Sequence, residues 1–131
     1  MLLAFIVVFF KPHNILTNEE EAGIGYISYN SNYNQEKAEL ELVNNTEYDE
    51  NKVLECIAKY KEYRTLRSVK SYKKRNVQLE ILYYTEDKFR MIHLGNSNYS
   101  FEANDKHKSQ KSNIVNGDSL RDELLILIGR G

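Results

Sequence analysis

The sequence of 131 residues has no tryptophan, one proline and one cysteine. A single cysteine excludes an internal disulfide, so no covalent framework sets the fold, and the redox compartment stays open. A formal net charge of −1 excludes a global field that would steer a polyanion or a polycation to the protein. The chain also lacks a phosphate-binding glycine loop, because Gly23-Ile24-Gly25 precedes a predicted strand and not a helix.

Metal-ligand and calcium-loop spacings are missing as well. The three histidines do not form the HxxxH or HxH pairs that bring two imidazoles to one metal ion. The glutamates at positions 19–21 form a run without the alternating oxygen spacing of a calcium loop. We therefore expect no catalytic residues, no cofactor and no metal site, and we expect that the protein is not an enzyme.

Two potentially reactive side chains have a structural interpretation. His93 follows Phe89 and Met91 in a predicted strand, which is typical of a partly buried histidine with satisfied ring nitrogens. A small hydrolase centred on His93 would need a Glu, Asp or Ser side chain beside it in a pocket. Cys56 falls on the apolar stripe of a predicted helix, where we expect a small buried hydrophobe rather than a reactive thiol.

The most uneven feature is a wholly apolar run, MLLAFIVVFF, over residues 1–10. As a helix this run would reach about 15 Å, half of the roughly 30 Å hydrocarbon core of a bilayer. It fits the end of a longer signal-anchor, a short uncleaved hydrophobic end, or a buried strand or helix of the core. We favour an anchor, because so apolar a strand needs cover on both faces and the rest of the chain offers little material for it.

Length and patterning predict one domain after this run. We divide the chain into an apolar leader or truncated signal-anchor (1–11), a polar spacer (12–22) and a single α+β domain (23–131). The expected packing is a mostly antiparallel sheet of about five strands with two helices on one face. Strands are expected over 23–29, 37–43, 77–85, 89–94, 99–103 and 112–115, helices after caps at Thr46 and Ser119, and a connecting segment over 64–76.

Charge is unevenly distributed along the chain. Residues 15–56 carry ten acidic side chains against two basic ones, whereas residues 59–75 carry eight basic ones against Glu62. Tyrosines at positions 60, 63 and 72 interleave with these cations, a composition that can bind nucleic acid, phosphate-rich polymers or lipid headgroups. A solvated helix end and loop is the alternative. The residues that we predict to contact an anion are Arg64, Arg67, Lys70, Lys73, Lys74 and Arg75.

Residues 46–128 also resemble a small family of extracytoplasmic domains of unknown function. The stretches that carry the resemblance are YRTLRS (63–68) as the end of a helix, VQLEI (77–81) as a strand, HLG (93–95), YSF (99–101) and IVNG (114–117), the last leading into the helix over 120–128. These domains occur in secreted or membrane-tethered proteins of low-GC Gram-positive bacteria, and the surplus of Asn, Lys, Ile and Tyr is typical of AT-rich coding. The resemblance implies an N-terminal signal or anchor and one α+β domain, and it brings no known activity.

These features predict a non-enzymatic, membrane-associated or secreted binding or sensing domain on the extracytoplasmic side. The expected partners are the membrane, through the N-terminal segment, and an anionic lipid or a cell-wall polymer. The alternative is a cytosolic nucleic-acid-binding module that uses residues 59–75, which a membrane anchor would disfavour. The sequence does not identify the ligand.

Overall fold

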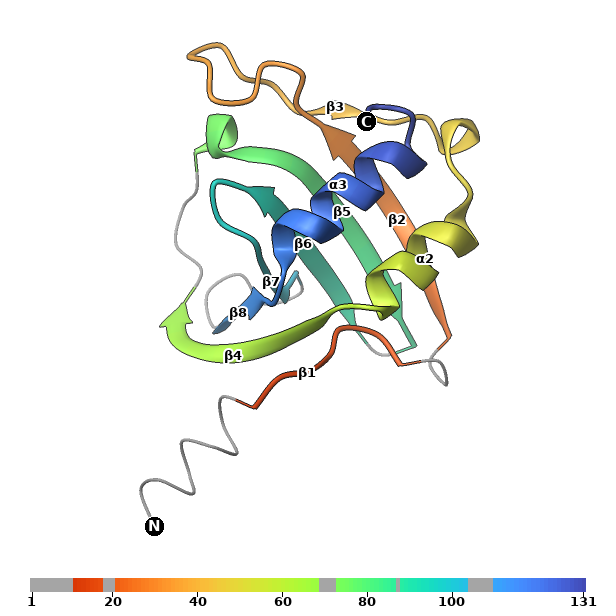
Figure 1. Ribbon diagram of the computed structural model, residues 1–131, viewed down its shortest axis with the longest axis vertical. Coiled ribbons are helices and arrows are strands. Elements are labelled where there is room, and N and C mark those ends of the chain that lie inside the picture. Colours follow the sequence, from red (N-terminus) through yellow and green to blue (C-terminus); the bar gives the residue numbers. More distant parts are fainter. Residues whose placement is uncertain (1–10, 18–20, 69–72, 87, 104–109) are drawn as a thin grey trace.

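A computed structural model describes residues 11–17, 21–68, 73–86, 88–103 and 110–131. Eight strands form one antiparallel sheet in the order β1-β4-β8-β7-β6-β5-β2-β3, and two helices, α2 and α3, pack together on one face of it (Figure 1). The predicted α+β class, antiparallel sheet and two helices are confirmed. The predicted number of about five strands is wrong, because the sheet has eight.

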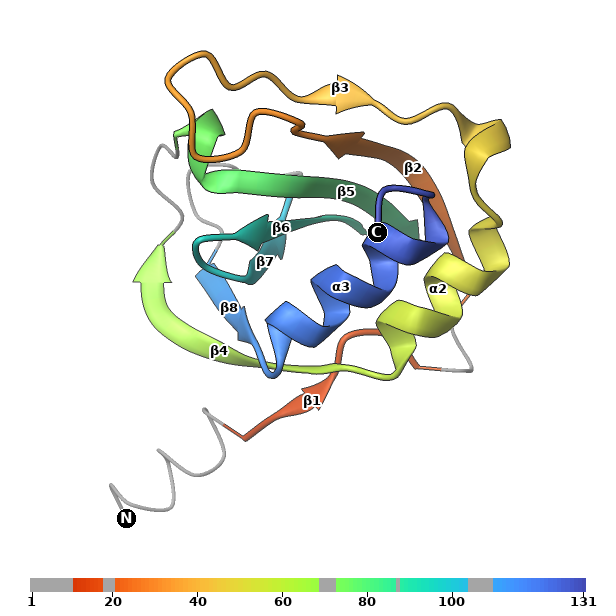
Figure 2. The same cartoon turned by 45° about the horizontal axis from the view of Figure 1, so that its top comes forward.

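The strands are β1 (His13–Asn14), β2 (Ala22–Tyr29), β3 (Glu41–Leu42), β4 (Lys61–Ser68), β5 (Val77–Thr85), β6 (Phe89–Gly95), β7 (Tyr99–Glu102) and β8 (Gln110–Ile114). The helices are α2 (Glu50–Ala58) and α3 (Gly117–Leu127), with short 3-10 turns η1 (Asn45–Glu47) and η2 (Lys74–Asn76). The sheet curves around α2 and α3, as the second view shows (Figure 2). No helix among the described residues has the length and apolar character needed to cross a membrane.

The additional strands lie where the sequence carries no alternating apolar pattern. β4 occupies part of the predicted connecting segment, and residues 63–68 lie in this strand and not at the end of a helix, so that expectation is wrong. Glu62 is buried in β4, and a charged residue at a buried position hides the strand pattern. β1 has only two residues and lies within the predicted polar spacer 12–22. Ile15 and Leu16, directly after β1, are buried in the domain core. This part of the expected spacer therefore contributes to the packed domain.

The strand predicted over residues 37–43 is wrong in length and in facing. Only Glu41–Leu42 pairs with β2, as the edge strand β3. The Leu42 side chain, expected in the core, is 72% exposed, whereas Val43 is 6% exposed and donates its backbone N–H to the Ile27 carbonyl. Since side chains alternate along a strand, this one-residue difference exchanges the buried and exposed positions.

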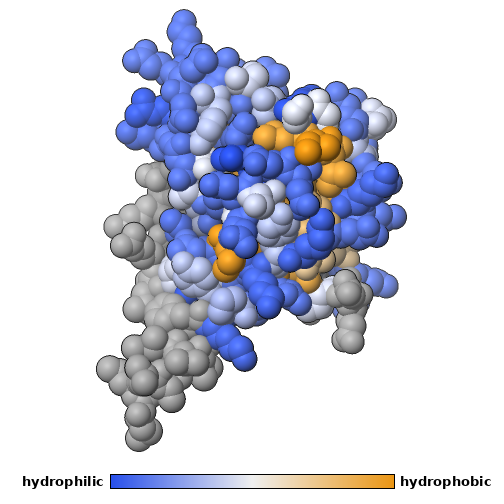
Figure 3. Space-filling view, viewed as in Figure 1, coloured by the Kyte–Doolittle hydropathy of each residue, from blue (hydrophilic) through white to orange (hydrophobic). Residues whose placement is uncertain are grey.

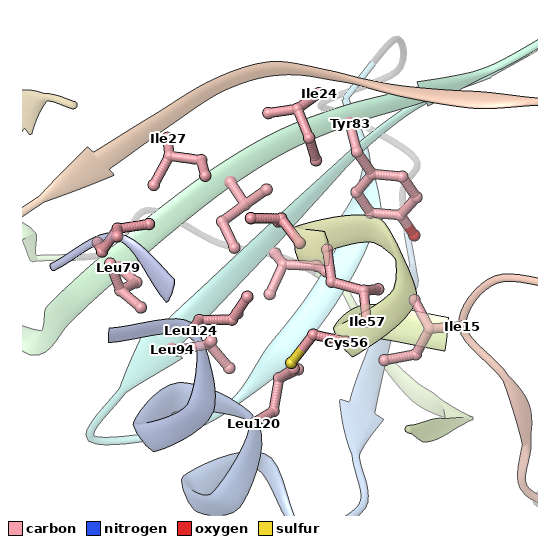
Figure 4. Close-up of a cluster of buried hydrophobic side chains, with 14 of the residues drawn as sticks. Ile15, Ile24, Ile27, Cys56, Ile57, Leu79, Tyr83, Leu94, Leu120 and Leu124 are labelled. Carbon is pink, nitrogen blue, oxygen red and sulfur yellow. The ribbon is translucent and has the colours of Figure 1, made fainter. Parts of the chain in front are cut away.

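The core forms between the sheet and the two helices, as the patterns of β5 and α2 predict. The four alternating residues of β5, at positions 77, 79, 81 and 83, are all buried. Val53, Cys56 and Ile57 of α2 are buried with Leu120 and Leu124 of α3. In Figure 4, Leu79 and Tyr83 of the sheet converge with Ile57, Leu120 and Leu124 of the helices, and Cys56 lies between Ile57 and Leu120.

The helix ends differ from the predicted caps at both starts. The carboxylate of Asp49 caps α2 by accepting hydrogen bonds from the backbone of residues 51 and 52, and Thr46 lies one turn earlier in η1. Ser119, predicted as the cap of the last helix, lies inside the first turn of α3. Asn116 is the N-cap residue there, in the left-handed conformation with φ 55°. Gly129, with φ 74°, follows the helix end as predicted.

Candidate functional site

The two ends of β5 mark two separate regions of the protein surface. Its nine residues, Val77–Thr85, span about 26 Å at roughly 3.3 Å per step. The turn η2 directly precedes β5, and the connection from β5 to β6 follows its other end. In Figure 1, η2 and the loop after β2 lie near the upper end of β5, and β1 lies towards its lower end. We call these the η2 end and the β1 end.

Half of the predicted anion-contact residues gather at the η2 end. Lys73 is the N-cap residue of η2, Lys74 and Arg75 lie within it, and all three side chains are exposed. Arg64 is exposed on β4, Arg67 lies in β4, and Lys70 lies outside the described residues. We define the basic corner as residues 73–76 of the η2 segment, the facing loop 30–37 and Asn96 of the β6–β7 turn.

Asparagine side chains hold the backbone of the basic corner in place. The buried Asn30 side chain donates its amide N–H groups to the carbonyl oxygens of Lys74 and Val77, both at 3.1 Å. The Arg75 carbonyl accepts the backbone N–H of Asn34 at 2.8 Å, and the residue-76 carbonyl accepts that of residue 96 at 3.0 Å. Four consecutive carbonyl oxygens, 74 to 77, are thereby bonded to neighbouring loops, so the backbone that carries the cations is fixed.

Side-chain bonds extend this network across the basic corner. The Asn96 amide donates to the Asn76 amide oxygen at 2.9 Å, and its own amide oxygen accepts the Tyr33 hydroxyl at 2.5 Å. The sequence signal for this arrangement is the asparagine-rich run 30–35, whose composition by itself indicates only a loop. What a single sequence does not show is that residues 30, 76 and 96, far apart in the chain, meet at one end of the sheet.

The cations of the basic corner have no carboxylate partner in the described part of the chain. No ion pair involving Lys73, Lys74 or Arg75 occurs there, and the facing loop adds one charge of each sign, Glu36 and Lys37, both exposed. The surface over this end is strongly hydrophilic, whereas apolar surface gathers over the C-terminal part of α3 (Figure 3). The η2 segment therefore presents three exposed positive charges to solvent from a hydrogen-bonded backbone.

The fold separates the rest of the basic stretch from this corner. Lys59, at the end of α2, pairs with Glu123 of α3 at 3.2 Å. The Tyr60 hydroxyl donates to Glu123 at 2.8 Å, and the Tyr63 hydroxyl accepts from Asn113 of β8 at 3.3 Å. Tyr72 lies outside the described residues. The cations and tyrosines of 59–75 thus contact several different elements.

A buried ionic cluster marks the β1 end. Glu62 of β4 is 3% exposed and accepts a hydrogen bond from Ser100 of β7. One of its carboxylate oxygens lies 3.4 Å from Arg90 Nη2 and 3.4 Å from His13 Nε2. Arg90 also donates Nε–H to the Tyr83 hydroxyl at 3.1 Å. Arg90 is the second residue of β6 and pairs with Tyr83, near the end of β5 remote from η2. The cluster therefore links β1 to that end through side chains, although β4, β8 and β7 lie between β1 and β6 in the sheet.

His93 is the centre of a second buried network, on the sheet face that points away from the helices. It is fully buried, with Nε2 2.8 Å from Glu80 and Nδ1 2.9 Å from the Tyr99 hydroxyl, and Tyr26 donates to Glu80 at 3.1 Å. The expectation of a histidine with satisfied ring nitrogens is confirmed. Glu80 is the carboxylate that a hydrolase would need, yet none of the three described surface grooves includes His93.

Two tyrosines of this network predict a loss of stability at high pH. Burial, with the Glu80 carboxylate adding to it, raises the pKa of Tyr26 and of Tyr99 to about 12 from 10.0. The unfolded chain loses these protons from about pH 10, so the stability they confer is complete below pH 10 and falls as the pH rises towards 12. Guanidinium titrations between pH 9 and 12 should show this fall. Tyrosinate absorbance should lose amplitude near pH 12 in Tyr26→Phe and in Tyr99→Phe, whereas Tyr60, whose pKa is also raised by burial and by Glu123, keeps part of the late phase. A late phase of unchanged amplitude in both variants would contradict the prediction.

Cys56 adjoins a surface groove of about 500 Å³ between α2 and α3. Its Sγ lies 3.4 Å from Glu123, and the thiol is 3% exposed, as expected for a small buried hydrophobe. Hydrogen bonds from Tyr60, Lys59 and Cys56 lower the pKa of Glu123. Burial, followed by the hydrogen bond and charge of Glu123, raises the pKa of Cys56 to about 12. These groups form a structural contact between the helices.

The Cys56 thiol should be unreactive in the folded protein. At pH 8 the raised pKa leaves a thiolate fraction about a thousand-fold smaller than in the unfolded chain, and the thiolate is the reactive form. A chromogenic disulfide reagent should therefore label the native protein about a thousand-fold more slowly than the protein in guanidinium. Glu123→Gln, which removes the neighbouring negative charge, should accelerate labelling, and equal rates in native and denatured protein would exclude this interpretation.

Neither metal-ligand geometry nor similarity to known proteins assigns a further functional site to the described residues. Within the described ranges, no group of three or more His, Cys, Asp and Glu side chains could hold a metal ion. The chain matches no protein-family model, no curated protein and no solved structure in the three comparisons made. The resemblance to extracytoplasmic domains stays a prediction, and the candidate site is the basic corner, defined by geometry and charge alone.

Proposed function

We propose that this protein is a non-enzymatic, membrane-associated domain on the extracytoplasmic side that binds an anionic ligand through the basic corner. The observation that carries this proposal is the set of three exposed cations, Lys73, Lys74 and Arg75, on a backbone fixed by hydrogen bonds. A solvated loop needs neither fixed backbone geometry nor cations of one sign. Preorganised charges lose less conformational entropy on binding, which favours recognition of an anion.

Membrane association is proposed from the N-terminal sequence. Residues 1–10 are entirely apolar, and they directly precede the short segment that leads into β1. The resemblance to secreted or membrane-tethered domains supports the same location. The absence of enzymatic activity is proposed because His93 is fully buried in bonds to Glu80 and Tyr99, which leaves it no contact with a substrate.

Nucleic acid is the less favoured ligand. Proteins that bind single strands without sequence preference stack bases on aromatic side chains beside the cations. The hydroxyl groups of Tyr60 and Tyr63, which we expected to interleave with the cations, are instead bonded to Glu123 of α3 and Asn113 of β8.

Cell fractionation with surface proteolysis tests this location. The full chain, expressed with its native upstream sequence in a Gram-positive host, should sediment with membranes and be cleaved by protease added to protoplasts. Val7→Asp with Phe9→Asp should release it, because each acidic residue costs about 3 kcal/mol at the centre of a membrane helix. Leu42→Asp with Ile126→Asp, at exposed positions, is the matched control and should stay with the membrane. Recovery of the unaltered chain in the cytosol would refute the proposal.

A further inference from the structure

We infer that the ligand of the basic corner is an anionic polyol polymer, a chain that carries phosphate or carboxylate groups among hydroxyl groups, and that it is bound away from the membrane surface. This inference rests on the proposed function, since it assumes that residues 1–10 hold the protein at a membrane. The class of partner follows from the distance between the basic corner and the β1 end, and from the side chains of the basic corner.

The position of the basic corner argues against lipid headgroups of the same membrane. The ionic cluster of Glu62, Arg90 and His13 places β1, and with it the attachment of the N-terminal segment, at the β1 end. Tyr83, which Arg90 contacts, lies seven residues along β5 from Asn76 of the basic corner, about 23 Å at roughly 3.3 Å per step. The Debye length at physiological ionic strength is about 8 Å, so anionic headgroups at the β1 end would be screened from these cations.

The chemistry of the basic corner favours a ligand with hydroxyl groups as well as charge. The cations of η2 face a loop with exposed amides, Asn32 and Asn34, each able to donate and accept hydrogen bonds. The one aromatic side chain in the described corner, Tyr33, is tied to Asn96 by its hydroxyl group. A polyol phosphate or an acidic polysaccharide offers charge to η2 and hydroxyl groups to these amides, whereas a nucleic acid would find only the single ring of Tyr33 in the described corner on which to stack its bases.

Co-flotation with a defined polymer tests the inference. The full chain is reconstituted in neutral phosphatidylcholine vesicles, and fluorescent poly(glycerol phosphate) is added at low ionic strength. The polymer should float with protein-loaded vesicles and stay behind with empty ones. Raising the salt from 50 to 200 mM should weaken binding at least about ten-fold, because about three ionic contacts are broken. This salt dependence needs no variant and so does not depend on a variant's folding.

Two charge-reversed variants locate the contact. Lys73→Glu, Lys74→Glu and Arg75→Glu together should lower polymer affinity at least about ten-fold. Lys52→Glu, Lys61→Glu and Lys88→Glu together make the same change in net charge at exposed positions outside the basic corner and the N-terminal segment, and should change affinity less than about two-fold. Equal losses in the two triple variants would show a non-specific charge effect and overturn the inference.

The remaining outcomes separate this inference from the proposed function. Protein that floats but carries no polymer would overturn the inference and leave membrane association standing. Protein that fails to float would refute membrane attachment through residues 1–10. It would also refute the orientation assumed for the vesicle-bound protein. Capture of a second population of phosphatidylglycerol vesicles through Lys73, Lys74 and Arg75, with weaker polymer binding, would identify lipid as the ligand. Displacement of the polymer by an oligonucleotide of equal charge at lower concentration would identify nucleic acid.

Discussion

Arg90→Met is expected to destabilise the fold by about 3 kcal/mol, because it leaves the Glu62 carboxylate buried without its main cation. Glu62 is 3% exposed, and its other described partners are Ser100 and His13. Arg90 also bonds Tyr83, so the variant removes a second hydrogen bond from the same cluster. The measurement is the free energy of unfolding from a guanidinium titration at pH 7.

A double-mutant cycle separates the ion pair from packing. Glu62→Leu alone leaves Arg90 short of its buried partner, although Glu102 lies 3.9 Å away and can hold part of its charge. The double variant removes both charges and should lose less stability than the two single variants together, since replacing a whole buried pair by apolar side chains is often close to neutral. Additive losses would mean that the pair is not coupled and that Arg90 acts through its packing alone.

Leu124→Ala is expected to cost about 2–5 kcal/mol, the range for truncating a buried leucine and leaving a cavity. Leu124 of α3 is 1% exposed and belongs to the cluster that joins both helices to the sheet. The matched control is Ile126→Ala on the same helix, where the side chain is 69% exposed and the cost should stay within about 0.5 kcal/mol. Similar losses in the two variants would contradict the packing of α3 described above.

The sequence predicted the parts of the fold in which burial follows a regular period. β5 begins and ends at the predicted residues, 77 and 85, and the apolar stripes of α2 and α3 are buried as their spacing indicates. β4 was missed because its buried Glu62 breaks the alternation that marks a strand. The partner of that charge, Arg90, lies 28 residues away, so no local pattern indicates that the position is buried.

The candidate site was predicted in part for the same reason. The cluster of Lys73, Lys74 and Arg75 is visible as a run of charge, but its separation from Lys59 and Arg64 depends on the path of β4. The role of Asn30 depends on hydrogen bonds to residues 44 and 47 positions later in the chain. Local composition predicts a polar loop at residues 30–35, and only the sheet topology brings that loop to η2.

Mapping of amide shifts by NMR locates the bound polymer on the protein residue by residue. The full chain in neutral phosphatidylcholine nanodiscs, labelled with ¹⁵N, is titrated with poly(glycerol phosphate). We expect the largest shifts on the backbone amides of residues 30–35, 73–77 and 96, while the amides around Arg90 and His13 stay unchanged. Largest shifts at the β1 end, or shifts spread evenly over all lysines and arginines, would contradict the assignment of the ligand to the basic corner.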